Sequence, residues 1–319
     1  MKVSDKNVTG VCLWGTMQDM AGIFSSGLLL VVVLTLGSCG SSGSGTPPPP
    51  PPPVYSFAYL NHVGANLYQI KIMKTDGTSQ TPVGSPDNFT YVRLSNDGKK
   101  IVFSYLDSSN VYHVGVINAD GSSRTNLTLP AAQNYAQYPQ FTPDGTKIIY
   151  QSLTINGYLD IVTINPDGSN PTFLTNGGGN HFWPTVSPDG KLIALAVDSS
   201  SAPYALATMH IDGSGLSVVG SGLTSRYPAF SSDGTKIFFN DSTNGSAEFI
   251  YSVNLDGTNV KQLTQSSYDY CPLALGNDVL FQSTASGSFL DGNQVFEMPS
   301  DGSGMTRLTH DAVFDGFCL

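Results

Sequence analysis

The sequence predicts an all-β protein, a six-bladed β-propeller of four-stranded blades whose ring is closed by the C-terminal strand. The first observation is an Asp-Gly pair that ends a strand-like run six times, 44 to 47 residues apart, at Asp76, Asp120, Asp167, Asp212, Asp256 and Asp301. A second turn series interleaves with it at Asp97, Asp144, Asp189 and Asp233, with a weakened copy at Gly276-Asn277-Asp278. Two turn series with one period indicate a single supersecondary unit that is repeated along the chain.

The composition favours β-structure and limits the classes of partner that the protein can bind. Of the 319 residues only 12% are charged, whereas Gly (34), Pro (20), Tyr (15) and Phe (16) are plentiful. Many turns combined with aromatic and β-branched runs are typical of strands. The net charge of −10 repels phosphate backbones, which argues against a nucleic-acid partner. The four cysteines show neither C-x-x-C spacing nor a Cys/His cluster, so we predict no zinc site and no cofactor.

The first 38 residues resemble a lipoprotein-type signal peptide. An apolar run over residues 23–36 has about the length of a signal-peptide core and is short for a membrane span. It leads into Leu36-Gly37-Ser38-Cys39, which resembles a bacterial lipobox. The resemblance implies that Cys39 becomes the lipidated first residue of the mature protein. The segment before the core is not clearly basic, so a start at Met17 or Met20 and an uncleaved signal anchor are open alternatives.

Residues 39–53 are predicted to form a tether. Gly40 to Gly45 are all Gly and Ser, which makes a flexible linker, and Pro47 to Pro53 form a polyproline II spacer of roughly 3 Å per residue. Such a stalk would hold residues 54–319, the predicted propeller, clear of the membrane headgroups. Gly rather than Asp follows Cys39. By the sorting rule of some Gram-negative lipoproteins, this implies an exported protein that is lipid-anchored to the outer membrane, in the periplasm or at the cell surface.

The repeat around Arg226 shows the strands of one blade most completely. The predicted strands are Tyr227–Phe230, Lys236–Phe239, Phe249–Asn254 and Val260–Thr264. Asp-Gly between apolar runs is a strong hairpin signal, because Gly supplies the positive φ that a tight turn requires. Four antiparallel strands in 40 to 50 residues are typical of a propeller blade.

These repeats resemble a known family. The motifs Tyr-Pro-x-Phe, Ser/Thr-Pro-Asp-Gly-x-Lys-Ile, x-Asp-Gly and Leu-Thr look like the WD-repeat-like propeller repeats of the TolB C-terminal domain. The likeness extends from about Tyr55 to Leu319. The α/β domain that precedes the propeller in TolB is missing from this sequence, so a role in the Tol–Pal envelope system is not implied.

The first and last repeats are incomplete in complementary ways. The segment from Tyr55 lacks a first strand, and the tail that follows Leu308-Thr309 could supply it, which would remove the open edge of the ring. The spacing from Leu-Thr places Phe317 where Tyr227 lies in blade five, whereas the pattern alone places Phe314 there. In the first register Cys271 and Cys318 could form a ring-closing disulfide, and in the second they would be too far apart.

Aromatic residues that begin the innermost strands are the candidate ligand site. We expect them to form a collar at one mouth of the channel: Tyr91, Tyr138, Trp183 and Tyr227, with Tyr270 one position away beside Cys271. The polar residues expected nearby are His181, Arg226, Asp269, His310, Asp311 and Asp315. This mouth lies at the end from which the longer loops emerge: Asp107–Asn110, Asp198–Pro203, Asp241–Ser246 and Ser283–Asn293. An aromatic recess suits a peptide or a sugar, although the same residues could be wedge packing between blades.

The predicted function is a non-enzymatic binding or scaffold module of the cell envelope. It would act as a monomer and recognise an envelope protein, a peptide or a glycan at the channel face. No catalytic or metal-ligating residue is assigned, because the five histidines are not at ligand spacing and each Asp-Gly turn usually carries one acid. Related repeats occur in lyases and peptidases, so the alternative is a polysaccharide lyase-like or hydrolase-like enzyme that acts on an extracellular sugar polymer. A structural subunit of a surface complex is a third possibility.

Overall fold

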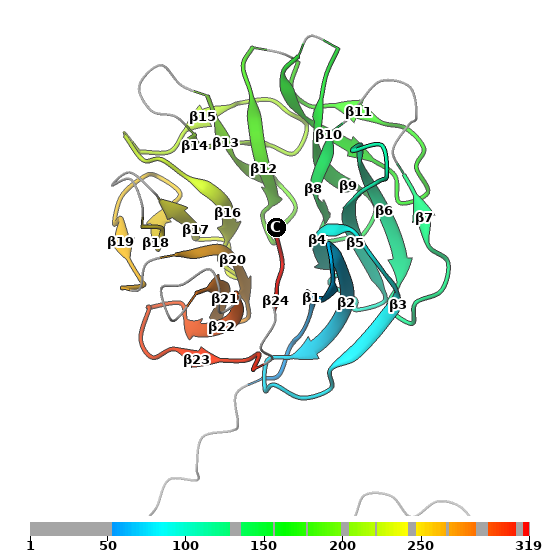
Figure 1. The fold of residues 1–319 in the computed structure, drawn as a ribbon. Coiled ribbons are helices and arrows are strands. Elements are labelled where there is room, and N and C mark those ends of the chain that lie inside the picture. Colours follow the sequence, from blue (N-terminus) through cyan, green and yellow to red (C-terminus); the bar gives the residue numbers. More distant parts are fainter. Residues whose placement is uncertain are drawn as a thin grey trace, which may run out of the picture. The chain divides into compact units, whose positions relative to one another are not determined.

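A computed structural model shows six four-stranded antiparallel sheets arranged as a ring, with no helix among the described residues (Figure 1). The structure describes residues 53–127, 135–155, 157–176, 178–198, 204–220, 222–241, 247–265, 268–284, 293–310 and 315–318. The all-β six-bladed propeller that the sequence predicts is therefore confirmed. The predicted signal peptide (1–38), Cys39 and all but the last residue of the predicted tether lie outside the described residues.

Each sheet contains consecutive strands, except that the last strand of the chain joins the first blade. From the innermost strand outward, blade one contains β24 (Asp315–Gly316), β1 (Ser56–Gly64), β2 (Leu67–Lys74) and β3 (Thr81–Asp87). Blade two contains β4 (Phe89–Leu94), β5 (Lys100–Leu106), β6 (Tyr112–Asn118) and β7 (Thr125–Asn126). Blade three contains β8 (Ala136–Phe141), β9 (Ile148–Leu153), β10 (Leu159–Ile164) and β11 (Thr172–Phe173).

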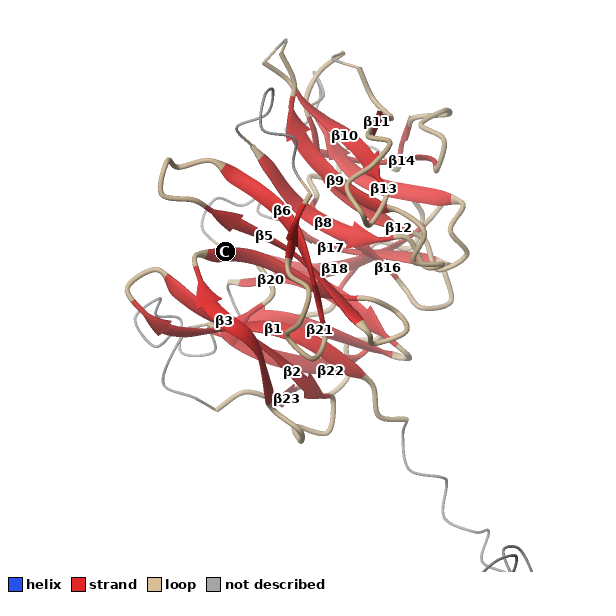
Figure 2. Cartoon of the chain, turned by 90° about the vertical axis from the view of Figure 1, so that its right-hand side faces the viewer, coloured by secondary structure: helices blue, strands red, loops and turns tan. Residues whose placement is uncertain are grey.

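The second half of the ring repeats the pattern, and Figure 2 shows the blades from the side. Blade four contains β12 (His181–Val186), β13 (Leu192–Val197), β14 (Ala205–His210) and β15 (Ser217–Val218). Blade five contains β16 (Arg226–Phe230), β17 (Lys236–Asp241), β18 (Phe249–Asn254) and β19 (Lys261–Gln262). Blade six contains β20 (Asp269–Leu275), β21 (Asp278–Ser283), β22 (Gln294–Pro299) and β23 (Thr306–Arg307).

Tight turns built on aspartate join the strands at one end of each blade. In blade five, Asp256 accepts hydrogen bonds from the backbone N–H of Thr258 (3.0 Å) and from its hydroxyl (2.6 Å), and Gly257 has φ of 81°. In the other turn Asp233 accepts a hydrogen bond from the Ser231 hydroxyl (2.6 Å). These hydroxyl hydrogen bonds, first among the causes, lower the pKa of both aspartates. The recurring Asp-Gly pairs are therefore the hairpin turns that the sequence predicts.

The core lies between the blades. Alternate residues of a second strand pack against different neighbours: Ile237 and Phe239 cluster with blade four, whereas Phe238 clusters with blade six. Six such clusters of buried apolar side chains occur among the described residues, one at each junction between blades. Burying a Phe side chain contributes roughly 2–3 kcal/mol, so each blade depends on both of its neighbours for stability.

The C-terminal strand closes the ring. β24 pairs with β1 through Leu60 and Gly316 and runs into the middle of the ring (Figure 1). Gly316 lies opposite Leu60, the fifth residue of β1. In blade five, Arg226, the residue before Tyr227, likewise lies opposite Asn240, the fifth residue of β17. Phe317 therefore takes the place of Tyr227. The register predicted from the Leu-Thr spacing is confirmed, and the register that uses Phe314 is wrong.

No helix in the described part of the chain is long and apolar enough to cross a membrane.

One half-buried carboxyl group occupies a position that other blades fill with neutral residues. Glu297 on β22 lies at the register position of Thr163, Thr208 and Ser252 in blades three, four and five. Burial, together with the nearby Asp278 carboxylate, raises the pKa of Glu297 to about 7. The ionised form of Glu297 therefore destabilises the folded state at neutral pH.

We predict that Glu297→Gln is more stable than the wild type at about pH 8 and that this difference shrinks towards about pH 5. The folded-state pKa lies above the ordinary glutamate value of 4.5, so the folded protein binds more protons than the unfolded chain between these values. Wild-type stability therefore falls as the pH rises through this window, and the cost is complete above pH 7. Urea-unfolding midpoints measured across the range test this, and an equal gain at both pH values would contradict it.

Candidate ligand site in the central channel

A backbone bulge directs one side chain from each of four innermost strands towards the channel. The residues involved have φ values of 50–55° and stand between shifts in strand register. Each is followed by proline: Tyr138-Pro139, Trp183-Pro184, Tyr227-Pro228 and Cys271-Pro272. A bulge re-aims a side chain out of the regular pleat, and proline has no N–H to leave unpaired there. The aromatic-Pro motif of the sequence therefore encodes a specific backbone conformation.

Blade two departs from this pattern because it receives the C-terminal segment. Tyr91 is followed by Val92 rather than proline, and the backbone N–H of Val92 donates a hydrogen bond to the carbonyl oxygen of Phe317 (3.1 Å). Tyr91 also forms an isolated antiparallel bridge with Cys318. The end of the chain therefore binds to blade two as well as to blade one.

The four predicted collar residues converge in the channel. We call Tyr91, Tyr138, Trp183 and Tyr227 the aromatic layer. Ring centroids lie 5.2 Å apart for Tyr91 and Tyr138, 5.7 Å for Tyr138 and Tyr227, and 4.8 Å for Trp183 and Tyr227. Only 7% of Tyr91 and 9% of Tyr138 are exposed, whereas Trp183 and Tyr227 are partly exposed. The rings therefore contact one another edge-to-face or tilted across the channel.

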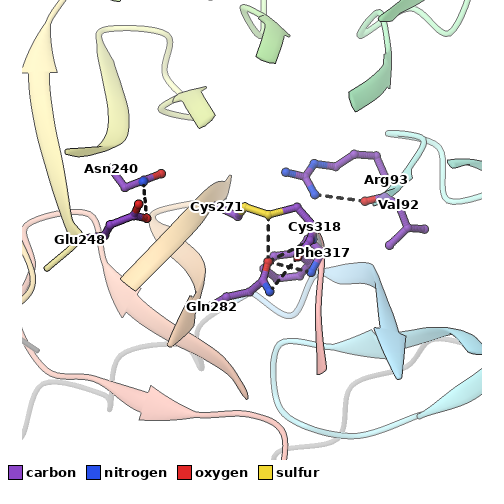
Figure 3. Close-up of a disulfide and its surroundings, with 8 residues drawn as sticks. All are labelled: Val92, Arg93, Asn240, Glu248, Cys271, Gln282, Phe317 and Cys318. Atoms are coloured by element: carbon purple, nitrogen blue, oxygen red, sulfur yellow. Dashed lines mark hydrogen bonds between the residues drawn. A yellow bond between two sulfur atoms is a disulfide. The ribbon is translucent and has the colours of Figure 1, made fainter. Parts of the chain in front are cut away.

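A disulfide joins the aromatic layer to the closing strand (Figure 3). Cys271 occupies in blade six the bulge position that aromatic residues hold in blades three to five, and it is bonded to Cys318, with 6.7 Å between their Cα atoms. Tyr270, one position before it, packs against the same cluster. The sequence left this pairing open, and the structure shows it.

Gln282, which the sequence reasoning missed, holds the end of the chain in place. Its buried Oε1 atom accepts hydrogen bonds from the N–H groups of Phe317 (3.2 Å) and Cys318 (3.1 Å), and its Nε2 donates to the Cys318 carbonyl (3.1 Å; Figure 3). Gln151 acts similarly between blades three and four, where its Oε1 accepts a hydrogen bond from the Trp183 N–H (2.8 Å). The available signal was a glutamine that recurs at the same position of two second strands, at Gln151 in β9 and Gln282 in β21.

The predicted polar residues are dispersed. His181 is buried, with Nδ1 3.2 Å from Asp160 Oδ1, so it links blades three and four. Asp269 is also fully buried. His310 is exposed beyond the outermost strand of blade six, and Asp311 lies outside the described residues, as does the side chain of Asp315.

Arg226 lies beside the aromatic layer. It forms an ion pair with Glu248 (3.0 Å) and lies over the Tyr204 ring. Burial, opposed by Arg226, raises the pKa of Glu248. This pair lies on the loop side of the layer, where residues 199–203, 242–246 and 285–292 of the predicted long loops are outside the described residues.

A pocket of about 580 Å³ opens at the opposite, tight-turn end of the channel. All six blades line it, and its floor is formed by Arg93, Gln140, Thr185, Ala229 and Leu273, which also contact the small space beneath the aromatic layer. The sequence predicts a recess at the end with the longer loops. The structure places this pocket at the other end, because each innermost strand passes from the aromatic layer to these residues before it reaches its tight turn.

No group of three or more His, Cys, Asp or Glu side chains within the described residues is placed to hold a metal ion.

Comparison with known proteins agrees with this architecture. A family model described as the TolB beta propeller domain matches residues 56–274. The chain belongs to this family. No curated protein matches the sequence.

Solved structures share the fold at low identity. TolB from Acinetobacter baumannii has a TM-score of 0.70 and 20% identity, and the match covers 82% of this chain and 65% of that one. A putative TolB from Agrobacterium tumefaciens has a TM-score of 0.62 and 22% identity over 84% of this chain and 91% of that one. Puromycin hydrolase has a TM-score of 0.54 and 12% identity over 79% of this TolB-family chain and only 45% of the hydrolase.

We predict that replacing both cysteines, Cys271→Ser with Cys318→Ser, lowers the free energy of unfolding by about 2–4 kcal/mol, because the crosslink closes a loop of 47 residues in the unfolded chain. Chemical denaturation measures this change. Reductant should produce a similar shift in the wild type and none in the double variant. Equal midpoints for the oxidised wild type and the double variant would show that the disulfide does not stabilise the ring.

Proposed function

We propose that this TolB-family propeller is a non-enzymatic protein-binding module of the cell envelope that takes a segment of its partner into the turn-end pocket. The observation that carries the proposal is the pocket itself, about 580 Å³ in volume and lined by residues of all six blades. A concave site with mostly apolar walls and a few convergent polar groups is the usual form of a binding site. Membership of the TolB propeller family supports the envelope setting.

The chemistry of the channel favours a peptide over a glycan as the ligand. Sugars bind by stacking on exposed aromatic faces, whereas the rings of the aromatic layer contact one another and are largely covered. The pocket offers instead backbone-lined turns and the side chains of Gln140 and Thr185 beside apolar surface from Ala229 and Leu273. That mixture suits an extended polypeptide, whose own groups alternate between polar and apolar.

The beginning of the described chain lies at the pocket, because Val54 and Tyr55 line it. The proposal also includes a membrane tether of residues 39–53, lipidated at Cys39.

We predict that a photo-crosslinking amino acid at Ser232, on the pocket rim, captures a protein partner in cells of the source organism, and that the same amino acid at Ser217, on the exposed outermost strand of blade four, does not. The variant Ala229→Trp, which fills the pocket floor, should abolish the Ser232 adduct while retaining the all-β circular dichroism spectrum. The proposal fails if no adduct forms at Ser232, or if the adduct survives in Ala229→Trp. Glycan release or peptide cleavage by the purified chain would support the enzyme alternative instead.

The tether has its own test. We predict that Cys39→Ser moves the full-length protein from the membrane fraction to the soluble fraction, because a thioether-linked lipid needs the cysteine sulfur. Fractionation followed by immunodetection measures the distribution, with Cys12→Ser as the matched control. Unchanged membrane partitioning of Cys39→Ser would show that the lipobox prediction is wrong.

A further inference from the structure

The pocket floor is one layer of equivalent positions on five innermost strands. Each residue of the layer is paired with a residue near the start of the second strand of its blade: Arg93 with Val102, Gln140 with Ile149, Thr185 with Ala194, Ala229 with Phe238 and Leu273 with Leu280. We call these five channel-facing residues the floor layer. Because they stand on paired strands rather than on loops, their positions are fixed by the fold.

The floor layer has two chemically different halves. In consecutive blades two, three and four it carries a guanidinium, an amide and a hydroxyl, from Arg93, Gln140 and Thr185. In blades five and six it carries the apolar side chains of Ala229 and Leu273. All three polar groups can donate hydrogen bonds into the pocket, whereas only the amide and the hydroxyl can also accept them. The polar half is therefore rich in donors.

Arg93 differs from two other arginines of the fold in its partners. Arg124 lies 2.6 Å from the Asp87 carboxylate, and Arg226 lies 3.0 Å from the Glu248 carboxylate. Among the described residues, Arg93 is in no ion pair within 4.0 Å; its Nη1 donates to the Val92 carbonyl (3.1 Å). The Arg93 guanidinium also lies 4.5 Å from the centroid of the Tyr91 ring.

The surroundings of Arg93 leave its charge only partly compensated. Figure 3 shows the side chain reaching from β4 towards the disulfide at the centre of the ring. Burial lowers the pKa of the guanidinium, although arginine keeps its proton in proteins. A cation partly removed from water needs a counter-charge or several acceptors, and one carbonyl and the faces of two rings, Tyr91 and Phe317 (5.5 Å), supply a part of this. Among the described residues that line the pocket, the one acid is Asp97, at a tight turn, where its Oδ1 accepts hydrogen bonds from Ser95 and Lys99.

We propose that the floor layer is a carboxylate receptor, in which Arg93, with donors from Gln140 and Thr185, binds an acidic group on the inserted partner segment while Ala229 and Leu273 contact its apolar neighbours. This inference rests on the proposed function and names the chemistry that the pocket selects. The carboxylate belongs to an Asp or Glu side chain or to the C-terminus of the segment. An overall charge of −10 works against indiscriminate binding of anions, so recognition depends on Arg93, the cation among the described residues that line the pocket.

Matched peptides test the proposal on the full chain. The probes are acetyl-Ala-Ala-Asp-Ala-Ala-amide, the same peptide with Asn in place of Asp, and acetyl-Ala-Ala-Ala-Ala-Ala with a free C-terminal carboxylate, titrated by NMR or by the fluorescence of Trp183 in the neighbouring aromatic layer. We expect the Asp peptide or the free-carboxylate peptide to bind at least about tenfold more tightly than the Asn peptide. The one of the two that binds identifies the source of the carboxylate.

Two arginine variants assign the effect to a residue. Arg93→Gln should remove the preference for the carboxylate, and Arg93→Lys should retain part of it, because lysine keeps the charge but loses the forked geometry. Arg307→Gln, at an exposed position on β23, is the matched control and should bind as the wild type does. Thermal melts verify that each variant is folded. If Arg93→Gln is unfolded, Arg93→Lys still tests the role of the guanidinium.

The outcomes separate this inference from the function on which it rests. Equal binding of all three peptides, with the Ser232 crosslink intact, would overturn the carboxylate receptor and leave the peptide-binding module standing. If inorganic sulfate binds and none of the peptides does, the floor layer is a small-anion site and the proposal is overturned. Absence of binding for every probe would also reject it.

Discussion

Every blade of this protein exposes two apolar faces, and only neighbouring blades can cover them. The alternation of β17, with Ile237 and Phe239 on one side and Phe238 on the other, places large apolar side chains on both faces. A row of blades would leave two such faces in water, so stability requires a closed ring. Closure is made by a few C-terminal residues: β24 pairs with β1, Cys318 is bonded to Cys271 of blade six, and Gln282 binds the backbone beside it.

The same closure decides which end of the channel is available. The C-terminal segment reaches the centre of the ring next to Tyr91, and the bulges of blades three to five direct Tyr138, Trp183 and Tyr227 to the same level. Together they pack into one layer. Among the described residues, the pocket lies between this layer and the tight turns. A ligand in that space touches side chains on strands, which hold their geometry more rigidly than loops do.

The fold could be predicted because its signals are local and repeated. An Asp-Gly turn depends only on neighbouring residues, so six copies of it at one spacing predict six blades. The Leu-Thr spacing also predicts the register of Phe317. The candidate site was harder to predict. That Tyr138 and Tyr227 would meet at 5.7 Å depends on the diameter of the ring and on the bulge conformation, and neither is local. Gln282 was missed because its partners, at Phe317 and Cys318, lie 35 and 36 residues further along the chain.

The floor layer shows how a symmetric ring can become a selective site. Six equivalent strands would give six equivalent side chains if the repeat were perfect, and a uniform floor could distinguish ligands only by size. Here blades two to four place donors in the floor, whereas blades five and six place Ala229 and Leu273 there. The hairpin turns can stay regular while this one layer varies, because the floor residues face the channel; Leu273 also packs against the apolar cluster between blades six and one. Selectivity can therefore change from blade to blade without disturbing the closure on which the whole structure depends.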